Sequence, residues 1–235
     1  MTLAQLLFTQ GFGSRRECAG LIAAGVVAVD GRVRDDPHEE LEVDGLVFSV
    51  RGEPWSYRDR AVLAMNKPPG YECSQKPRHH PSVYSLLPAP LRRRGVQAIG
   101  RLDADTTGVL LFTDDGTLIH RLTSPKHHVP KVYEVRCAHE VDADQLARLR
   151  EGVVLHDDPA AVRAQACEAT GASTLRLTLT EGKYHQVKRM VAAVGNRVEA
   201  LHRSQIGALV LPADLAPGQW RWLSAAEVEA LRSAR

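Results

Sequence analysis

Residues 100–112 read Gly-Arg-Leu-Asp-Ala-Asp-Thr-Thr-Gly-Val-Leu-Leu-Phe, and this stretch decides how the middle of the chain folds. Its last four residues form a short apolar run, which the turn-forming residues 113–116, Thr-Asp-Asp-Gly, then close. A short apolar run bounded by turn signals predicts a buried strand. The preceding polar loop carries Arg101, Asp103 and Asp105, so we expect a charged loop at the mouth of a rigid strand, where chemistry is commonly placed.

Two aspartates of this loop, Asp103 and Asp105, are candidate nucleophiles. An aspartate attacks well only when it is held ionised and aimed, and a nearby cation does both. Arg101 lies two residues before Asp103, and residues two apart share a face of an extended chain, so these two side chains could point the same way. Either aspartate could instead cap the turn. The residues alone therefore leave the choice between them open.

The rest of the chain alternates strand-like runs with a few helical stretches. Strands are predicted at residues 61–65, 132–135 and 175–179, and the last of these alternates apolar and polar side chains. Helices are predicted from Asp142 to Gly152 and from His185 to Val194, where apolar residues recur at core spacing. This mixture predicts an α+β domain built on a mostly antiparallel mixed sheet.

The first fifty residues read as a separate small module. Leucines within residues 3–7 recur at helical spacing, and Ser14 with Glu17 forms a capping box for a second helix, which Gly25 ends. The turn pair at residues 30–31, Asp-Gly, lies between two apolar runs and predicts a hairpin. A helix-helix-hairpin order follows from these signals.

The predicted domain organisation is a small module at residues 1–52 and a larger domain at residues 60–235. The polar residues 51–60, which include Gly and Pro, read as a linker between them. No apolar run approaches the roughly 18 residues that span a bilayer, and the first residues have no signal-peptide pattern. We therefore expect a cytoplasmic protein, and we expect it to be a monomer without a membrane partner.

The chain has a formal net charge of +2, but the charge is unevenly distributed. Residues 1–50 hold four arginines against eight acidic residues, whereas the rest holds 26 basic residues against 20 acidic ones. A mildly basic larger domain suits a polyanionic partner.

Several function classes lack their motifs. The sequence has no phosphate loop, no dinucleotide fingerprint and no nucleophile elbow. Its four cysteines are scattered without a paired spacing, so free thiols are expected and structural zinc is not. These cysteines are Cys18, Cys73, Cys137 and Cys167.

Three further segments carry groups suited to chemistry or to RNA. Residues 66–74 follow a strand and turn on Pro-Gly, and Lys67 in this turn is either a phosphate contact or a structural residue. Residues 123–133 form a basic loop suited to phosphates, and they contain Lys126, His127, His128, Lys131 and Tyr133. Residues 181–190 begin a helix and contain the cations Lys183, Lys188 and Arg189. The paired histidines have no carboxylate or cysteine at ligand spacing beside them, so no metal is expected.

The pattern G-R-L-D-x-D-T-T-G-x-x-L-x-T-x-D-G resembles the active-site signature of RNA pseudouridine synthases, in the RsuA-type branch that modifies ribosomal RNA. Within this resemblance Asp103 matches the nucleophilic aspartate, which makes Asp105 the turn residue. Tyr133 matches the tyrosine whose ring packs on the target base. Lys188 matches the base that pairs with the catalytic carboxylate and keeps it ionised. Arg101 is expected to hold the flipped nucleotide or to fill the space that it leaves.

The N-terminal module resembles the S4 RNA-binding domain, through S-R-R-E-x-x-x-L-I-x-x-G-x-V-x-V-D-G-x-V. In that family the second helix lies on RNA, which indicates Arg15 and Arg16 as RNA contacts. The module departs from the family because it is acidic overall and its first helix lacks the usual Arg-Leu-Asp-Lys opening. The two arginines could instead be a solvated helix start.

The resemblance covers nearly the whole chain and is closer to enzymes of 16S rRNA than to those of 23S rRNA. It implies that the chain isomerises a specific uridine of 16S rRNA to pseudouridine, with no cofactor and no metal. The implied partner is ribosomal RNA, free or in a partly assembled small subunit. Two alternatives remain, an enzyme of 23S rRNA and a non-catalytic RNA-binding factor of ribosome assembly.

Overall fold

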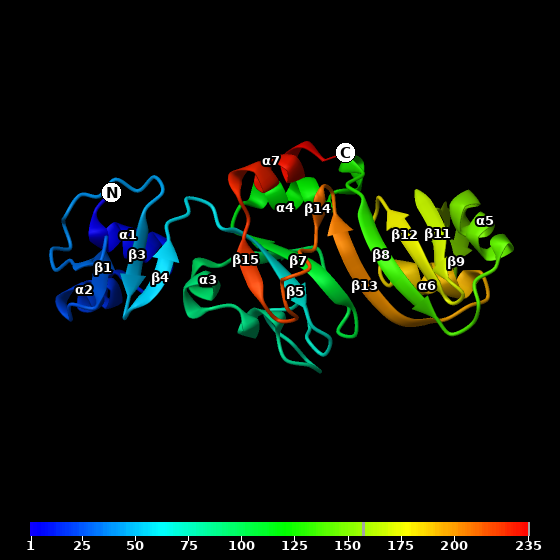
Figure 1. Ribbon diagram of the computed structural model, residues 1–235, viewed down its shortest axis with the longest axis horizontal. Coiled ribbons are helices and arrows are strands. Elements are labelled where there is room, and N and C mark those ends of the chain that lie inside the picture. Colours follow the sequence, from blue (N-terminus) through cyan, green and yellow to red (C-terminus); the bar gives the residue numbers. More distant parts are fainter. Residues whose placement is uncertain (157, 235) are drawn as a thin grey trace. The chain divides into compact units, whose positions relative to one another are not determined.

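The computed structural model describes residues 1–156 and 158–234, and its chain divides into two compact units (Figure 1). The first unit contains Met1–Ala61 and Leu87–Gln97. The second unit contains Val62–Leu86 and the chain from Ala98 onward. Leu87–Gln97 thus groups with the N-terminal module, although the sequence had suggested one uninterrupted larger domain after residue 60.

The first unit has the predicted order of two helices followed by a hairpin. Both helices begin with a capping box, in which Thr2 and Ser14 accept hydrogen bonds from the third helical N–H. Gly25 follows the second helix with a positive φ of 63°, and residues 30–31 form the hairpin turn. The elements are α1 (Leu3–Thr9), α2 (Arg15–Ala23), β1 (Val27–Val29), β2 (Arg32–Val33), β3 (Val47–Val50), β4 (Glu53–Ser56) and α3 (Ala89–Arg94).

Strand β4 corrects the prediction of a linker at residues 51–60. It pairs antiparallel with β3 and closes a sheet of order β2-β1-β3-β4. Pro54 lies in this strand, and proline is tolerated there because β4 is at the edge of the sheet, where one side of the backbone needs no partner. The Gly and Pro that suggested a linker are therefore a turn and an edge-strand residue.

The second unit is built on a mixed sheet of order β11-β12-β8-β13-β7-β5-β15. Neighbours along this path pair antiparallel except β13 and β7, which are parallel, so the predicted mostly antiparallel sheet is confirmed. The strands of this path are β5 (Val62–Lys67), β7 (Thr107–Thr113), β8 (Lys131–Cys137), β11 (Ala166–Gly171), β12 (Thr174–Leu179), β13 (Val198–Ile206) and β15 (Trp220–Trp222).

The helices and shorter strands of the second unit lie around this sheet (Figure 1). The predicted helices at 142–152 and 185–194 are confirmed as α5 and α6, and the sequence analysis did not identify α4 and α7. The elements are η1 (Val83–Leu86), β6 (Gln97–Ile99), α4 (Gly116–Thr123), η2 (Pro125–His127), α5 (Ala143–Glu151), β9 (Val153–Leu155), β10 (Asp158–Val162), α6 (Gln186–Ala193), β14 (Leu209–Val210) and α7 (Ala225–Ser233).

Two apolar cores fill the second unit, and strand β13 contributes to both. Leu201 packs in the core formed by β8, β12, α5 and α6, whereas Ile206 packs in the core formed by β5, β7, α4 and α7. The predicted strand Val109–Phe112 is confirmed within β7, and all four of its residues are buried. The loop of residues 100–106, which precedes β7, therefore emerges between the two cores.

Two further observations bear on the sequence-based expectations. The four cysteine thiols are free, as predicted. Within the described part of the chain, no helix is long and apolar enough to cross a membrane.

Candidate active site

The loop of residues 100–103 forms one wall of a cavity of about 190 Å³ in the second unit. Other walls come from β8, which supplies Tyr133, from the start of α6, and from β13. Asp103 lines the cavity, and Asp105 does not. The side chain of Asp103 is 29% exposed and that of Asp105 is 71% exposed, so only Asp103 lies in a sheltered position facing the cavity.

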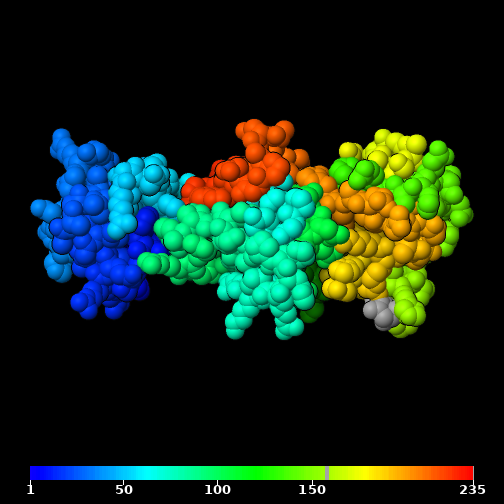
Figure 2. Space-filling view, turned by 90° about the horizontal axis from the view of Figure 1, so that it is seen from below, coloured from blue at the N-terminus to red at the C-terminus, as the bar shows by residue number. Residues whose placement is uncertain are grey.

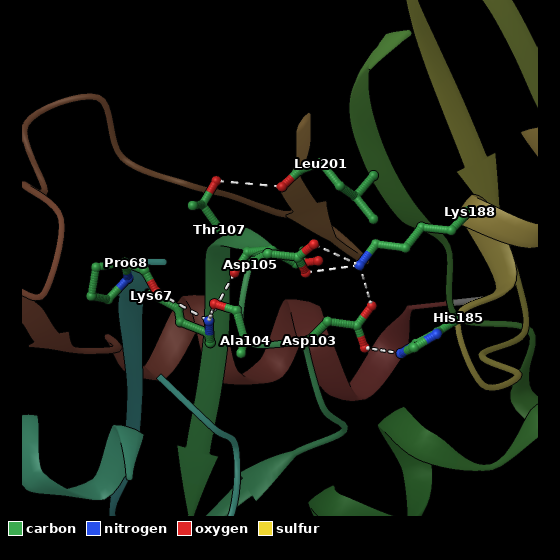
Figure 3. Close-up of polar contacts among 10 residues, drawn as sticks. Lys67, Pro68, Asp103, Ala104, Asp105, Thr107, His185, Lys188 and Leu201 are labelled. Carbon is green, nitrogen blue, oxygen red and sulfur yellow. Dashed lines mark hydrogen bonds and ion pairs between the residues drawn. The ribbon is translucent and has the colours of Figure 1, made fainter. Parts of the chain in front are cut away.

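Two cationic or potentially cationic side chains hold the carboxylate of Asp103 (Figure 3). The Lys188 Nζ lies 3.0 Å from Oδ2, and the His185 Nε2 lies 3.2 Å from Oδ1. Lys188 belongs to the first turn of α6, and His185 is the residue that precedes this helix. The two contacts use different oxygens, and together they fix the orientation of the carboxylate. The geometry that the sequence required of Asp103 and Lys188 is present.

Lys188 also pairs with Asp105, at 2.8 Å and 2.9 Å from its two oxygens. Burial disfavours the charged lysine, but hydrogen bonds to Asp105 and Asp103 outweigh this and raise the pKa of Lys188. Burial also disfavours the charged Asp105, yet Lys188 reverses the effect and lowers the pKa of that carboxyl. The ammonium is therefore charged at neutral pH and shared between two carboxylates.

Lys67 is a structural residue and not the phosphate contact that we had considered. Its side chain is fully buried, and its Nζ donates to the carbonyls of Pro68, Ala104 and Thr106 at 3.0, 3.2 and 2.8 Å (Figure 3). Burial lowers the pKa of Lys67. An ammonium so enclosed cannot reach an RNA phosphate. Instead it ties the end of β5 to the turn that follows Asp103, and so positions the aspartate loop.

The deep end of the cavity carries Tyr133, Lys131 and Arg203. Tyr133 is 8% exposed and pairs directly with Arg203 across β8 and β13, so the two side chains share one face of the sheet. The Arg203 Nε donates to the carbonyl of Val109 at 3.0 Å. Burial, together with the nearby charge of Arg203, lowers the pKa of Lys131 to about 8. Two desolvated cations thus lie beside the tyrosine.

Of the other residues that the sequence predicted for the site, some line the cavity and others do not. Arg101 and Lys183 line the cavity, and Arg101 is exposed. Arg189 does not line it, and its Nη1 donates to the carbonyl of Tyr184 at 3.0 Å. Adjacent residues of a helix leave it on different sides, so Lys188 and Arg189 do not serve the aspartate equally.

The predicted basic loop of residues 123–133 is divided, because Lys131 and Tyr133 line the cavity and the middle of the loop lies outside it. Lys126 and His128 are exposed and His127 is half-buried around η2, and none of them is among the cavity residues. In residues 1–156 and 158–234, no cluster of three or more metal-ligating side chains forms around the histidines or elsewhere. The middle of the loop is therefore a surface feature whose proposed contact with RNA stays a prediction.

Arg15 and Arg16 belong to the first unit, where both side chains are exposed at the start of α2. The guanidinium of Arg15 lies 5.2 Å from the ring centre of Phe8, which is itself 44% exposed. Their contact with RNA also stays a prediction.

Sequence reasoning missed two site residues, His185 and Arg203. His185 was assigned only to the start of a helix, although its position three residues before Lys188 is a signal that both could reach the same group. Arg203 stands at an inward position of β13 and is 2% exposed, which is unusual for an arginine. A strand alternation that places a cation on the apolar face could have indicated a site residue.

Comparison with known proteins agrees with this geometry. A family model described as RNA pseudouridylate synthase matches residues 61–193, and a model of the S4 domain matches residues 1–47. The chain is 40% identical over 234 residues to an uncharacterized RNA pseudouridine synthase of Bacillus subtilis, covering 98% of each protein. It is also 40% identical over 226 residues to ribosomal small subunit pseudouridine synthase A of Escherichia coli, covering 93% of this chain and 95% of that protein.

A solved structure is similar to nearly the whole chain. The crystal structure of a pseudouridylate synthase superimposes with a TM-score of 0.70 at 33% identity, over 98% of this chain and 99% of that one. Sequence, fold and the two matched domains therefore agree along nearly the full length of the chain, which belongs to the RNA pseudouridylate synthase family and carries an N-terminal S4 domain.

Proposed function

We propose that this enzyme isomerises a specific uridine of 16S ribosomal RNA to pseudouridine, with Asp103 as the nucleophile. The observation that carries the assignment is the carboxylate of Asp103 at the cavity wall, held between Lys188 and His185. The choice of 16S rRNA is supported by the Escherichia coli relative, whose name places its activity on the small ribosomal subunit. An rRNA substrate is consistent with the cytoplasmic location that the sequence suggests.

The reaction exchanges one bond for another within the same nucleotide. The bond between C1′ and N1 breaks, uracil reorients while it is held, and C5 bonds to C1′. The proton that C5 loses and the proton that N1 gains balance, so no external oxidant or reductant is consumed. Attack by Asp103 on the sugar or on the base leads to this product. The target must first leave its stack, at a cost of a few kcal/mol.

The surrounding side chains have distinct roles in this proposal. Lys188 holds the carboxylate of Asp103 in position through an ion pair of 3.0 Å. Tyr133 forms a wall against which the uracil ring packs. Arg101 is exposed at the cavity mouth, where it holds the flipped nucleotide or fills the space that it leaves. The cations Lys126, His127, His128, Lys131, Lys183 and Arg189, with Arg15 and Arg16 of the first unit, contact the RNA.

The nucleophile is tested by a pair of matched substitutions in one loop. Asp103→Asn should abolish pseudouridine formation on a 16S rRNA transcript and leave RNA affinity within a few-fold, because the change is nearly isosteric. Asp105→Asn likewise removes a carboxylate charge that pairs with Lys188, but Asp105 does not line the cavity, so turnover should persist. Mass spectrometry of the RNA measures the pseudouridine that each variant forms. Turnover by the Asp103→Asn variant would remove Asp103 from its role.

The target is tested by mapping pseudouridine in the rRNA of a strain that lacks the gene. Loss of one 16S site supports the proposal. Loss of a 23S site moves the target to the large subunit, and loss of no site would indicate a non-catalytic RNA-binding factor.

A further inference from the structure

We propose that a groove beside the cavity of Asp103 and Tyr133, the uridine cavity, binds the nucleotide next to the target. The base of this nucleotide stacks on Tyr184, and its phosphate is held by the basic loop of residues 75–80. This inference rests on the proposed function, because it assumes that a single RNA strand delivers the target uridine to Asp103.

The groove is a second hollow of about 540 Å³ that is continuous with the uridine cavity. The two hollows share Arg101, Asp103 and Lys183. Residues 72–74, which end the turn after β5, line one side of the groove, and residues 182–185 line the other. A nucleotide that enters the cavity with its base extruded must leave its neighbour at the mouth, and this groove is at the mouth.

Tyr184 presents an aromatic surface to this groove. It is 68% exposed, whereas tyrosines in folded proteins are commonly half-buried. Its ring is stacked on that of His185, with ring centres 3.8 Å apart and planes at 19°. His185 in turn contacts Asp103. Exposed aromatic rings are the usual platforms for unstacked RNA bases, and they accept any base because every base has a π-face.

The loop of residues 75–80 is held in shape by Glu72. The carboxylate of Glu72 accepts hydrogen bonds from the backbone N–H groups of Arg78, His79 and His80, at 3.1, 2.7 and 2.9 Å. These bonds lower the pKa of Glu72, so the carboxylate that organises the loop stays ionised well below neutral pH. The backbone N–H of Lys76 is also used, since it donates to the Ser74 Oγ at 3.1 Å.

Because the backbone donors face inward, the side chains of the loop face solvent. Lys76 and Arg78 are exposed, and neither forms an ion pair with another residue in the described part of the chain. Figure 2 shows the segment between β5 and η1 projecting from the surface of the second unit. This loop directly follows residues 72–74, which line the groove together with Tyr184. Its lysine and arginine and the aromatic ring therefore match the alternation of phosphate and base along one RNA strand.

The stacking contact is tested with a fluorescent base. Once the modified uridine is mapped, a short 16S rRNA fragment carries 2-aminopurine next to it, before or after the uridine. Binding of the unaltered enzyme should quench the emission at one of the two positions. Tyr184→Phe keeps the ring and should keep the quenching, whereas Tyr184→Ala should lose it and raise Kd about tenfold. Its KM should rise more than its kcat falls.

The phosphate contact is tested through the salt dependence of binding. The double variant Lys76→Ala/Arg78→Ala should weaken binding of the same fragment and reduce the slope of log K against log salt by about 0.7 for each lost contact. The matched control is Arg136→Ala/Arg163→Ala, which removes two exposed charges of the same unit that belong neither to the groove lining nor to the loop of residues 75–80. The control should keep the slope of the unaltered enzyme.

The outcomes separate the two proposals. If the unaltered enzyme forms no pseudouridine in rRNA, the proposed function fails. If it does, but Tyr184→Ala quenches 2-aminopurine like the unaltered enzyme, or the Lys76→Ala/Arg78→Ala slope equals that of the control, the groove is not the binding site of the neighbouring nucleotide.

Discussion

At the scale of single residues, three of the positive groups that line the cavity have distinct surroundings. Lys188 pairs with the nucleophile, whereas Lys131 and Arg203 line the cavity and donate to the backbone carbonyls of Val129 and Val109. Two desolvated cations beside an empty volume favour a substrate group with acceptor oxygens, and uracil carries two. Lys131 is therefore expected to matter for binding only while it is protonated.

The titration of Lys131 predicts a loss of RNA affinity at alkaline pH. Its pKa is lowered to about 8, so it releases its proton as the pH rises through that value, and the cavity then loses a cation. Kd for the 16S fragment, measured by fluorescence anisotropy from about pH 7 to about pH 9.5, should increase above about pH 8. In Lys131→Arg the guanidinium stays charged, and this increase should be absent. Titration of the RNA itself is common to both proteins, so identical profiles would contradict the prediction.

Lys67 shows what the sequence could not provide at this scale. The motif that contains it predicts a turn, and the turn is present, but nothing in the motif indicates where the Nζ points. That direction depends on the loop of residues 104–106, which is almost forty residues away in the chain and supplies two of the three carbonyls. A contact of this kind is set by tertiary packing, and local sequence signals do not report it.

At the scale of elements, local signals predicted those that carry strong caps or a clear period. The capping box at Ser14 marked one helix start correctly, and the helix predicted from Asp142 to Gly152 is present with these two residues as its caps. Strand β4 was missed because its signals are those of an edge strand, and edge strands differ from linkers only through their neighbour. The parallel pairing of β13 with β7 also had no local signal, although it brings Arg203 to the cavity.

Gly108 makes that parallel pairing possible. Its φ is +109°, and a Cβ added there would lie 2.2 Å from the carbonyl oxygen of Arg203 and 2.7 Å from its nitrogen. Gly108→Ala must therefore push β7 from β13 or unfold this part of the sheet, and we expect a loss of roughly 2–3 kcal/mol in the free energy of unfolding. Urea denaturation measures this change in the free energy of unfolding.

The control for this substitution is Gly116→Ala. Gly116 opens α4, its φ is not positive, and a Cβ there meets nothing within 4 Å. Alanine has the higher helix propensity, so this variant should be as stable as the unaltered enzyme or slightly more stable, by up to about 1 kcal/mol. Equal stability of the two variants would show that β7 and β13 tolerate a side chain at residue 108.

At the scale of the whole molecule, charge is uneven along the chain. Residues 1–50 are acidic overall and the rest of the chain is basic, so long-range attraction to RNA comes from the residues after the first fifty. The S4 domain can still contribute where its few cations gather, and Arg15 and Arg16 lie together at the exposed start of α2. Because residues 1–50 are acidic overall, substitution of these two arginines tests whether the first unit binds RNA.

We predict that Arg15→Ala/Arg16→Ala in the full chain raises Kd for a 16S rRNA transcript and lowers the salt slope by about 0.7–0.9 for each lost phosphate contact. The kcat at saturating RNA should change little, because both residues belong to the first unit and every residue that lines the uridine cavity belongs to the second. The control Arg32→Ala/Arg60→Ala removes two exposed charges from the same unit. Its binding should depend more steeply on salt than that of Arg15→Ala/Arg16→Ala. If both double variants give one slope, Arg15 and Arg16 are a solvated helix start, and the S4 domain acts through other residues or not at all.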